Sequence, residues 1–192
     1  VAKAGMVVGD KMALATIDRA VAKAEMMGGG TTGIPQIQPI MVDGEEHYVL
    51  VMSTWDEYNL RTSTTTGTWF DIQKAAAAAE GRKNPIFKGG LGMYNNVVLH
   101  SHKSVIRFSD YGAGAVTASR SLFMGAQAMV CAFGSPGTGL RFDWNEETRD
   151  NGNQLVVSSG AIFGVKKTRF TIDGTAYDFG VIAVDSATAD PG

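Results

Sequence analysis

Residues 155–184 read LVVSSGAIFGVKKTRFTIDGTAYDFGVIAV, and this stretch decides the fold class. Leu155–Val165 is rich in β-branched residues and predicts a long strand that two glycines interrupt. Thr168–Ile172 and Tyr177–Val184 predict a hairpin about Asp173-Gly174, because an Asp-Gly pair tolerates the positive φ angles of a tight turn. The C-terminal part of the chain is therefore expected to be rich in strands.

Two amphipathic helices are expected upstream of this stretch. Apolar residues recur at spacings of three and four between residues 14 and 24, which predicts a helix over Lys11–Met27 with Asp10 as its N-cap. A second, short helix is expected over Thr54–Leu60. Thr54 precedes Glu57 by three residues, the spacing of a capping box.

The remaining segments complete an α+β pattern. Ile37–Val42 and His47–Met52 predict a hairpin, and Val97–Ser101 and Ser104–Phe108 predict two further strands. Ser121–Phe133 suits either a buried helix or an alternating strand. Further expectations are a helix over Trp69–Ala79, a glycine-rich loop over Asn84–Tyr94 and a charged strand or loop over Arg141–Thr148. Strands outnumber helices and do not alternate with them, so a doubly wound βαβ fold is excluded.

Composition restricts the class of protein. The chain has 192 residues, of which 44% are hydrophobic and 19% charged, so it has enough apolar side chains to bury a core. Its 24 glycines are therefore expected to punctuate structure rather than to signal disorder. The formal net charge is −2, which excludes a domain held to nucleic acid by phosphate contacts. No apolar run is long enough to span a bilayer. Cys131 lies among apolar residues and is expected to be buried.

Three histidines support an alternative hypothesis of function. His100 and His102 form an H-x-H pair on a predicted strand, so both side chains are expected on one face. A zinc site needs three or four ligands, and the only other histidine in the sequence is His47. The alternative is thus a metal-dependent enzyme with a β-domain that uses these three histidines.

The main interpretation assigns no catalytic, cofactor-binding or metal-binding residue. The segment from Gly112 to Thr117 lacks the last glycine of a dinucleotide fingerprint, and no hydrolase serine motif is present. Acidic residues between 143 and 150 are interleaved with arginines, which is typical of a solvated or inter-subunit ion-pair surface. The tryptophans are expected to be core residues or interface anchors.

A resemblance to a known family gives a sharper expectation. The segment Asn84–His100, which reads NPIFKGGLGMYNNVVLH, resembles the signature stretch of major capsid proteins from N-four-like tailed phages and related prophages. The flanking matches are collinear from about residue 12 to residue 186. They include VDGEE at 42–46, WFDIQ at 69–73, LFMGAQA at 122–128 and FGVKKTRF at 163–170.

The resemblance implies the Hong Kong 97-type capsid fold, which has axial and peripheral lobes. The N-terminal arm and the extended loop of that fold are expected to be absent here, because they would precede Val1. Residues 1–192 are then a single capsid-core unit. Within it, residues 10–35 and 140–170 are expected to form a peripheral-like lobe, and residues 36–139 and 171–186 an axial-like lobe.

The resemblance also implies a function by self-assembly rather than by catalysis. Subunits of this kind form the hexamers and pentamers of an icosahedral virion shell, assembled in the bacterial cytoplasm. The shell encloses double-stranded DNA without specific binding and is expected to accept decoration or scaffolding proteins. No membrane is involved. An encapsulin-type nanocompartment shell, which holds enzyme cargo, is a further alternative. The residues expected to make inter-subunit contacts are Arg61, Trp69, Lys88, Trp144, Glu147 and Arg149.

Overall fold

The computed structural model describes residues 3–26, 36–42, 44–63, 92–112, 114–134 and 142–188. The helical elements are η1 (Lys3–Gly5), α1 (Leu14–Met26), α2 (Thr54–Thr62) and η4 (Asp150–Gly152). The strands are β1 (Ile40–Val42), β2 (Glu45–Met52), β3 (Met93–Tyr94), β4 (Val97–Ser101), β5 (Arg107–Tyr111), β6 (Val116–Met124), β7 (Met129–Phe133), β8 (Phe142–Arg149), β9 (Gln154–Ala161), β10 (Phe163–Lys167), β11 (Arg169–Ile172), β12 (Thr175–Asp178) and β13 (Val181–Ala187).

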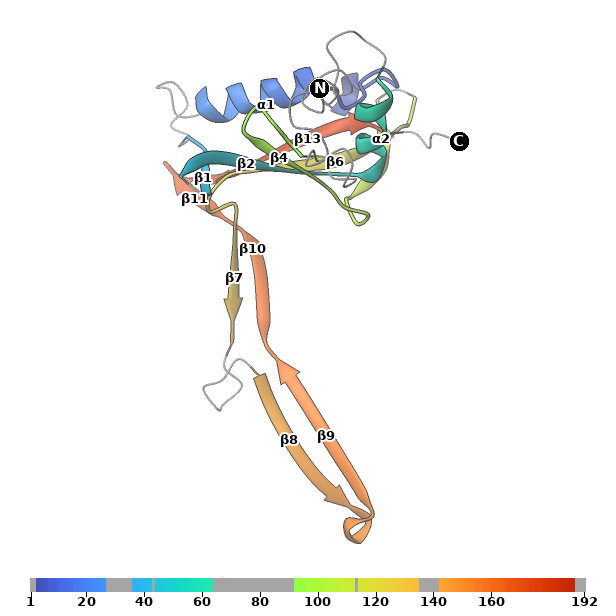
Figure 1. Cartoon of the computed structure of the whole chain (residues 1–192), viewed down its shortest axis with the longest axis vertical. Coiled ribbons are helices and arrows are strands. Elements are labelled where there is room, and N and C mark those ends of the chain that lie inside the picture. Colours follow the sequence, from blue (N-terminus) through green and yellow to red (C-terminus); the bar gives the residue numbers. More distant parts are fainter. Residues whose placement is uncertain are drawn as a thin grey trace, which may run out of the picture.

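A central sheet organises the described residues into two layers. Its strands follow the order β13-β6-β2-β4-β3, with β1 paired to β2 and β5 paired to β6. The β2–β4 pair is parallel, and the other pairs are antiparallel. Helix α1 lies along one face of this sheet (Figure 1). The α+β class expected from the sequence is confirmed at this level.

The core forms where α1 meets the sheet. Ile17, Val21 and Ala24 of α1 are buried, as their helical spacing predicts. Leu50 and Met52, two apart on β2, are also buried and lie in the same hydrophobic cluster. The helix begins at Leu14 rather than near Lys11, and Asp10 is not its N-cap. The Asp10 carboxylate instead accepts a hydrogen bond from the Val7 N–H at 2.9 Å and closes a turn before the helix.

The predicted turns are confirmed, but one of their strands differs. Val42 pairs with Glu45, and Gly44 has a φ of +88°, as a two-residue hairpin loop requires. Ile172 likewise pairs with Thr175 across Asp173-Gly174. The strand after this turn ends at Asp178 instead of continuing to Val184. Gly180, with a φ of +71°, turns the chain so that β13 joins the central sheet.

The structure decides one open alternative and corrects two expectations. Segment 121–133 forms strands rather than a helix: it contains the end of β6, a turn and all of β7. The long strand expected over 155–165 breaks at Ile162, between β9 and β10, rather than at its glycines. Ser53, not Thr54, caps α2 by accepting a hydrogen bond from the Asp56 N–H. The predicted helix over 69–79 and most of the loop over 84–94 lie outside the described residues.

A buried carboxylate fastens α2 to the sheet. Asp56 is fully buried, and its side chain accepts hydrogen bonds from four serine hydroxyls. The serines are Ser53 before α2, Ser119 and Ser121 on β6, and Ser186 on β13. A buried carboxylate is tolerated only when its oxygens are satisfied in this way. The network therefore fixes the helix against two neighbouring strands.

A second polar cluster joins β13 to β6 on the face away from α1. Arg120 donates two hydrogen bonds of 2.8 Å to Asp185, and Tyr111 donates a third of 2.9 Å. The hydrogen bonds from Arg120 hold the pKa of the Asp185 carboxyl below its ordinary value, although desolvation acts in the opposite direction. The paired strands are thus locked in register at this position.

We expect Asp56→Ala to destabilise the fold by about 3 kcal/mol or more, because hydrogen bonds to charged groups contribute about 1.5–3 kcal/mol each. Urea unfolding measures this loss. Glu57→Ala is the matched control on the same helix. It removes only the i,i+4 ion pair with Arg61, worth under about 0.5 kcal/mol. Equal unfolding midpoints for the two variants would show that the buried network does not hold α2.

We expect Asp185→Asn to destabilise the fold by on the order of 2 kcal/mol at neutral pH. Because the folded-state pKa of Asp185 is lowered, its stabilisation is complete above the ordinary pKa of 3.8 and is lost as the pH falls through the folded value. The difference in unfolding free energy between wild type and variant should therefore shrink in strong acid. A difference independent of pH would contradict the assignment.

Candidate assembly surface

Two strand pairs form an arm that projects from the central sheet. β7 pairs with β10, and β8 pairs with β9, in both cases antiparallel. We call these four strands the arm. Figure 1 shows β7 and β10 leaving the sheet and β8 and β9 continuing farther away, toward the turn at η4. In the described part of the chain, each pair forms its own two-stranded sheet, and no third strand pairs with either of them.

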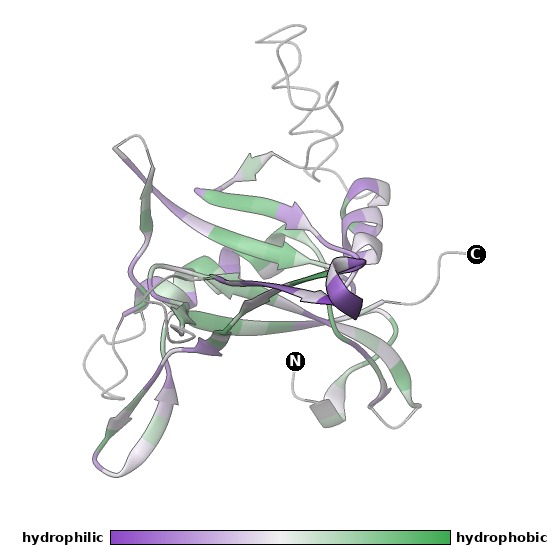
Figure 2. Ribbon diagram, turned by 90° about the horizontal axis from the view of Figure 1, so that it is seen from below, coloured by the Kyte–Doolittle hydropathy of each residue, from purple (hydrophilic) through white to green (hydrophobic). Residues whose placement is uncertain are grey.

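One face of the outer pair, which we call its apolar face, carries four large exposed hydrophobic side chains besides Glu146 and Thr148. Directly opposed residues share a face, so Phe142 and Trp144 lie on the same side as Leu155 and Val157. Their exposed fractions are 64%, 63%, 64% and 45%. In a monomer such large side chains are normally buried. Figure 2 shows that hydrophobic residues recur along strands and are not confined to the central sheet.

The opposite face of the outer pair is polar. It carries Asp143, Asn145, Glu147 and Arg149 from β8. Arg149 and Glu147 form an exposed ion pair of 3.0 Å, which contributes little to the stability of the monomer. The outer pair is thus an amphipathic ribbon with one face suited to water and one suited to a partner.

The inner pair has an apolar face of its own. Met129, Cys131 and Phe133 of β7 lie opposite Lys167, Val165 and Phe163 of β10. Phe163 is the most exposed of these hydrophobic side chains, at 68%. The prediction that Cys131 is buried is wrong for the single chain, because Cys131 is exposed on this face. Its apolar neighbours in sequence belong to the arm rather than to the core.

The root of the arm is held by close backbone contacts. Gly125 N–H donates to the Gly180 carbonyl at 2.9 Å, and the Ala126 N–H donates to Gln38 at 2.7 Å. A Cβ atom on Gly125 would lie 2.4 Å from the Gln38 oxygen, so only glycine fits there. Just beyond the root, Asp178 forms ion pairs with Lys167 and Arg169. These contacts set the direction in which the arm leaves the sheet.

The physical chemistry of the arm favours association. An isolated two-stranded ribbon is marginally stable in water because it has no layer to cover its apolar face. Full burial of a side chain such as Phe142 stabilises by roughly 1.5–3 kcal/mol, so covering the four exposed residues of the outer pair is worth on the order of 5 kcal/mol. That gain is available only when another surface lies against the arm.

The structure brings half of the predicted contact residues together. Trp144, Glu147 and Arg149 all lie on β8. Arg61 lies apart from them on α2, where it pairs with Glu57 at 2.9 Å. Trp69 and Lys88 lie outside the described residues. Because Trp144 is exposed on the arm, it is not part of the core of this chain.

Sequence reasoning missed the rest of the apolar surface. Phe142, Leu155 and Phe163 are as exposed as Trp144, yet none was singled out. A signal was present: apolar and polar residues alternate from Phe142 to Asn145, as on a strand with one covered face. The sequence could not show that none of the described residues covers this face.

The histidines do not converge on a metal site. His47 is buried on β2, whereas His100 is exposed on β4 and His102 follows that strand. The rings of His100 and His102 stack at 6.4 Å between centroids. Across the residues that the structure describes, no three His, Cys, Asp or Glu side chains are grouped to hold a metal ion. In the same residues, no helix is long and apolar enough to cross a membrane.

Comparison with known proteins gives a consistent result. The chain is 34% identical over 115 residues to the major capsid protein of Pseudomonas phage KPP25, which is 54% of this chain and 29% of that protein. It is 54% identical to a chain in the capsid of Ralstonia phage GP4, with a TM-score of 0.76 over 100% of this chain and 51% of that one. The chain thus spans about half the length of the GP4 chain.

Two more distant capsids share the fold. A chain of the cyanophage Pam1 capsid has a TM-score of 0.75 at 20% identity and is covered over 50% of its length. The capsid of Helicobacter pylori bacteriophage KHP30 has a TM-score of 0.67 at 19% identity over 60% of its chain. The family model described as phage capsid protein matches residues 1–190, and the chain therefore belongs to the phage capsid protein family.

Proposed function

We propose that this chain is part of the major capsid subunit of a tailed double-stranded DNA bacteriophage and that it acts by self-assembly. The observation that carries the proposal is the arm, whose apolar face has no cover in the described part of the chain. Exposed apolar patches of this kind mark interaction surfaces. Membership of the phage capsid protein family supports further copies of the same subunit as the partner.

The mechanism is energetic rather than chemical. A contact between an arm and a different surface of the next copy is heterologous, and such contacts generate rings when the rotation between copies closes. Closure makes many contacts intramolecular, so each one can be weak while the shell is stable. The exposed polar face of β8 keeps the free subunit compatible with water until assembly.

The finer features follow from the resemblance to Hong Kong 97-type capsids. We propose that subunits form hexamers and pentamers of an icosahedral virion shell, assembled in the bacterial cytoplasm. The shell would enclose double-stranded DNA without binding it specifically, which suits a net charge of −2, and would accept decoration or scaffolding proteins.

The division into lobes stays a prediction, and so do the inter-subunit contacts at Arg61, Trp69, Lys88, Trp144, Glu147 and Arg149. Within the described residues, α1 shares one hydrophobic cluster with β2, β4 and β6. A peripheral-like lobe that contains α1 must therefore be continuous with the axial-like one through this cluster.

We expect the double change Phe142→Ser with Trp144→Ser to lower the yield of closed particles at least tenfold. Each arm contact loses roughly 2 kcal/mol of apolar burial. The total loss is large because the shell contains many such contacts. Negative-stain electron microscopy and sedimentation of the protein expressed from its complete gene measure the yield. Because both side chains are exposed, unfolding of the subunit itself should change by less than about 0.5 kcal/mol.

Ile106→Ser is the matched control, since Ile106 is 62% exposed but lies on the loop before β5 rather than on the arm. It should assemble like wild type. Normal particle yield from the arm variant, with the control also normal, would show that the arm does not mediate assembly.

A further inference from the structure

The central sheet ends in an open edge at β13. β13 pairs with β6 on one side, and no described strand pairs with it on the other. The Ala187 N–H points to the open side, where it donates to the Asp10 carbonyl at 2.8 Å. Because backbone groups of an antiparallel strand point to alternate sides, those of Val181, Ala183 and Asp185 point outward too. An open row of this kind is a template for another strand.

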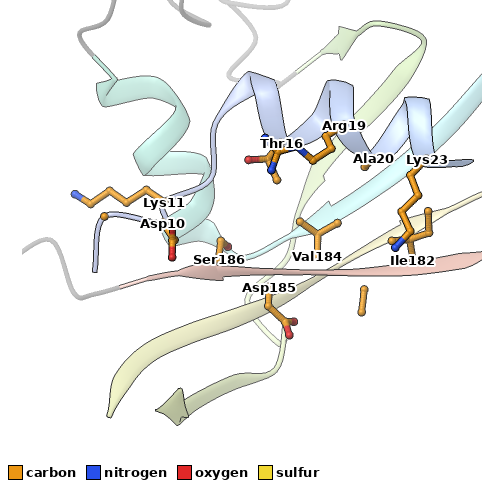
Figure 3. Close-up of a pocket in the computed structure, with 12 residues that line it drawn as sticks. Asp10, Lys11, Thr16, Arg19, Ala20, Lys23, Ile182, Val184, Asp185 and Ser186 are labelled. Atoms are coloured by element: carbon orange, nitrogen blue, oxygen red, sulfur yellow. The ribbon is translucent and has the colours of Figure 1, made fainter. Parts of the chain in front are cut away.

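A groove of about 340 Å³ runs along this edge between β13 and α1. Figure 3 shows Arg19 and Lys23 of α1 above the strand, with Lys23 extending toward Ile182. The Asp185 side chain points to the other side of the sheet. The groove thus has a backbone edge as its floor and a cationic helix face as its wall.

The cations of the groove are not neutralised within the described residues. Lys11, Arg19 and Lys23 are exposed and make no ion pair there. Two carboxylates line the groove: Asp185 is paired with Arg120, and Asp10 accepts a hydrogen bond from the Val7 N–H. A strand that enters the groove is therefore favoured when it carries negative charge.

Among the four arm strands, β8 alone is acidic. It carries Asp143, Glu146 and Glu147 against a single Arg149. β7 and β9 have no charged residue, and β10 carries two lysines. β8 has eight residues, which is enough to cover the part of the seven-residue β13 that precedes the Ala187–Asp10 hydrogen bond. β8 also has one side without a described partner strand.

We propose that β8 of one copy adds to the open edge of β13 in a neighbouring copy, beneath α1. The inference rests on the proposed function and names its subunit contact. Figure 1 shows the arm leading away from the sheet of its own chain, so the donor is a second copy. β13 and β8 belong to different surfaces, and the contact is therefore heterologous and propagates around a ring.

The two faces of the ribbon determine which way it docks. With its apolar face toward α1, Phe142 and Trp144 extend the row formed by Ile182 and Val184 on β13. Glu146 is the one β8 carboxylate on this face, where it accepts a hydrogen bond of 3.0 Å from Trp144 Nε1–H. In the docked ribbon it meets the Arg19 and Lys23 side of the groove. The docked ribbon thus pairs with the backbone edge of β13, covers the apolar row and places a carboxylate near the cations.

Zero-length carbodiimide cross-linking tests the contact in native particles. The reagent joins a lysine to a carboxylate only where they touch, and a mixture of ¹⁴N- and ¹⁵N-labelled copies identifies links between subunits. We expect mixed-isotope links from Lys11 or Lys23 to Glu146, the carboxylate on the docked face of β8. Lys103, exposed on the loop after β4, is the control and should form no link to this carboxylate.

A charge-reversal series gives a second measurement. Arg19→Glu with Lys23→Glu should lower particle yield at least tenfold, whereas Lys103→Glu should not. Adding Glu146→Lys to the reversed groove should recover at least part of the yield, because opposite charges face each other again.

The outcomes separate the two proposals. Closed particles that show no link between the groove and β8 would overturn the docking and leave the proposed function standing. Oxidised native particles in which Cys131 joins copies through a disulfide, with no groove link, would place arm against arm and overturn it as well. Absence of closed particles from the unmodified complete gene product would overturn the proposed function itself.

Discussion

A two-stranded ribbon has two faces and no second layer to cover either of them. The behaviour of the whole subunit depends on this constraint. The arm places Phe142, Trp144, Leu155 and Val157 on one side of such a ribbon, where its own chain supplies no described cover. In a monomeric enzyme this arrangement would be an aggregation hazard. In a subunit that assembles, burial of this uncovered face against a neighbouring copy contributes to the free energy of association.

The apolar face can be buried in a regular assembly only if the arm points in a defined direction. The tight approach of Gly125 to Gln38 and the backbone bond to Gly180 fix the root of the arm against the sheet. The sheet is stiffened in turn by the buried Asp56 network and by the Arg120–Asp185 pair. Polar groups buried in this way favour one arrangement over others, because an alternative would leave them unsatisfied. The rigid central sheet therefore holds the arm in one direction.

Local patterns in the sequence predicted the local structure and little beyond it. The apolar spacing along α1 and the Asp-Gly turns were predictable because neighbouring residues determine them. Asp56 could not be recognised, since its serine partners lie up to 130 positions away in the chain. Cys131 was misplaced for a related reason: an apolar stretch shows that a segment needs cover, but not whether the cover belongs to the same chain. The resemblance of residues 84–100 pointed to the family, although residues 84–91 of that stretch lie outside the described residues.

Charge decides which strand an open edge accepts. Backbone hydrogen bonds are the same for every sequence, so the edge of β13 alone would pair equally well with β8 or β10. Arg19 and Lys23 above that edge remove the ambiguity: they attract Glu146 of β8 and repel whichever of Lys166 and Lys167 of β10 would face them. The cations therefore select the strand both by repelling β10 and by attracting β8. A shell protein needs this discrimination more than it needs a strong contact, because a single misplaced strand propagates through every copy that follows.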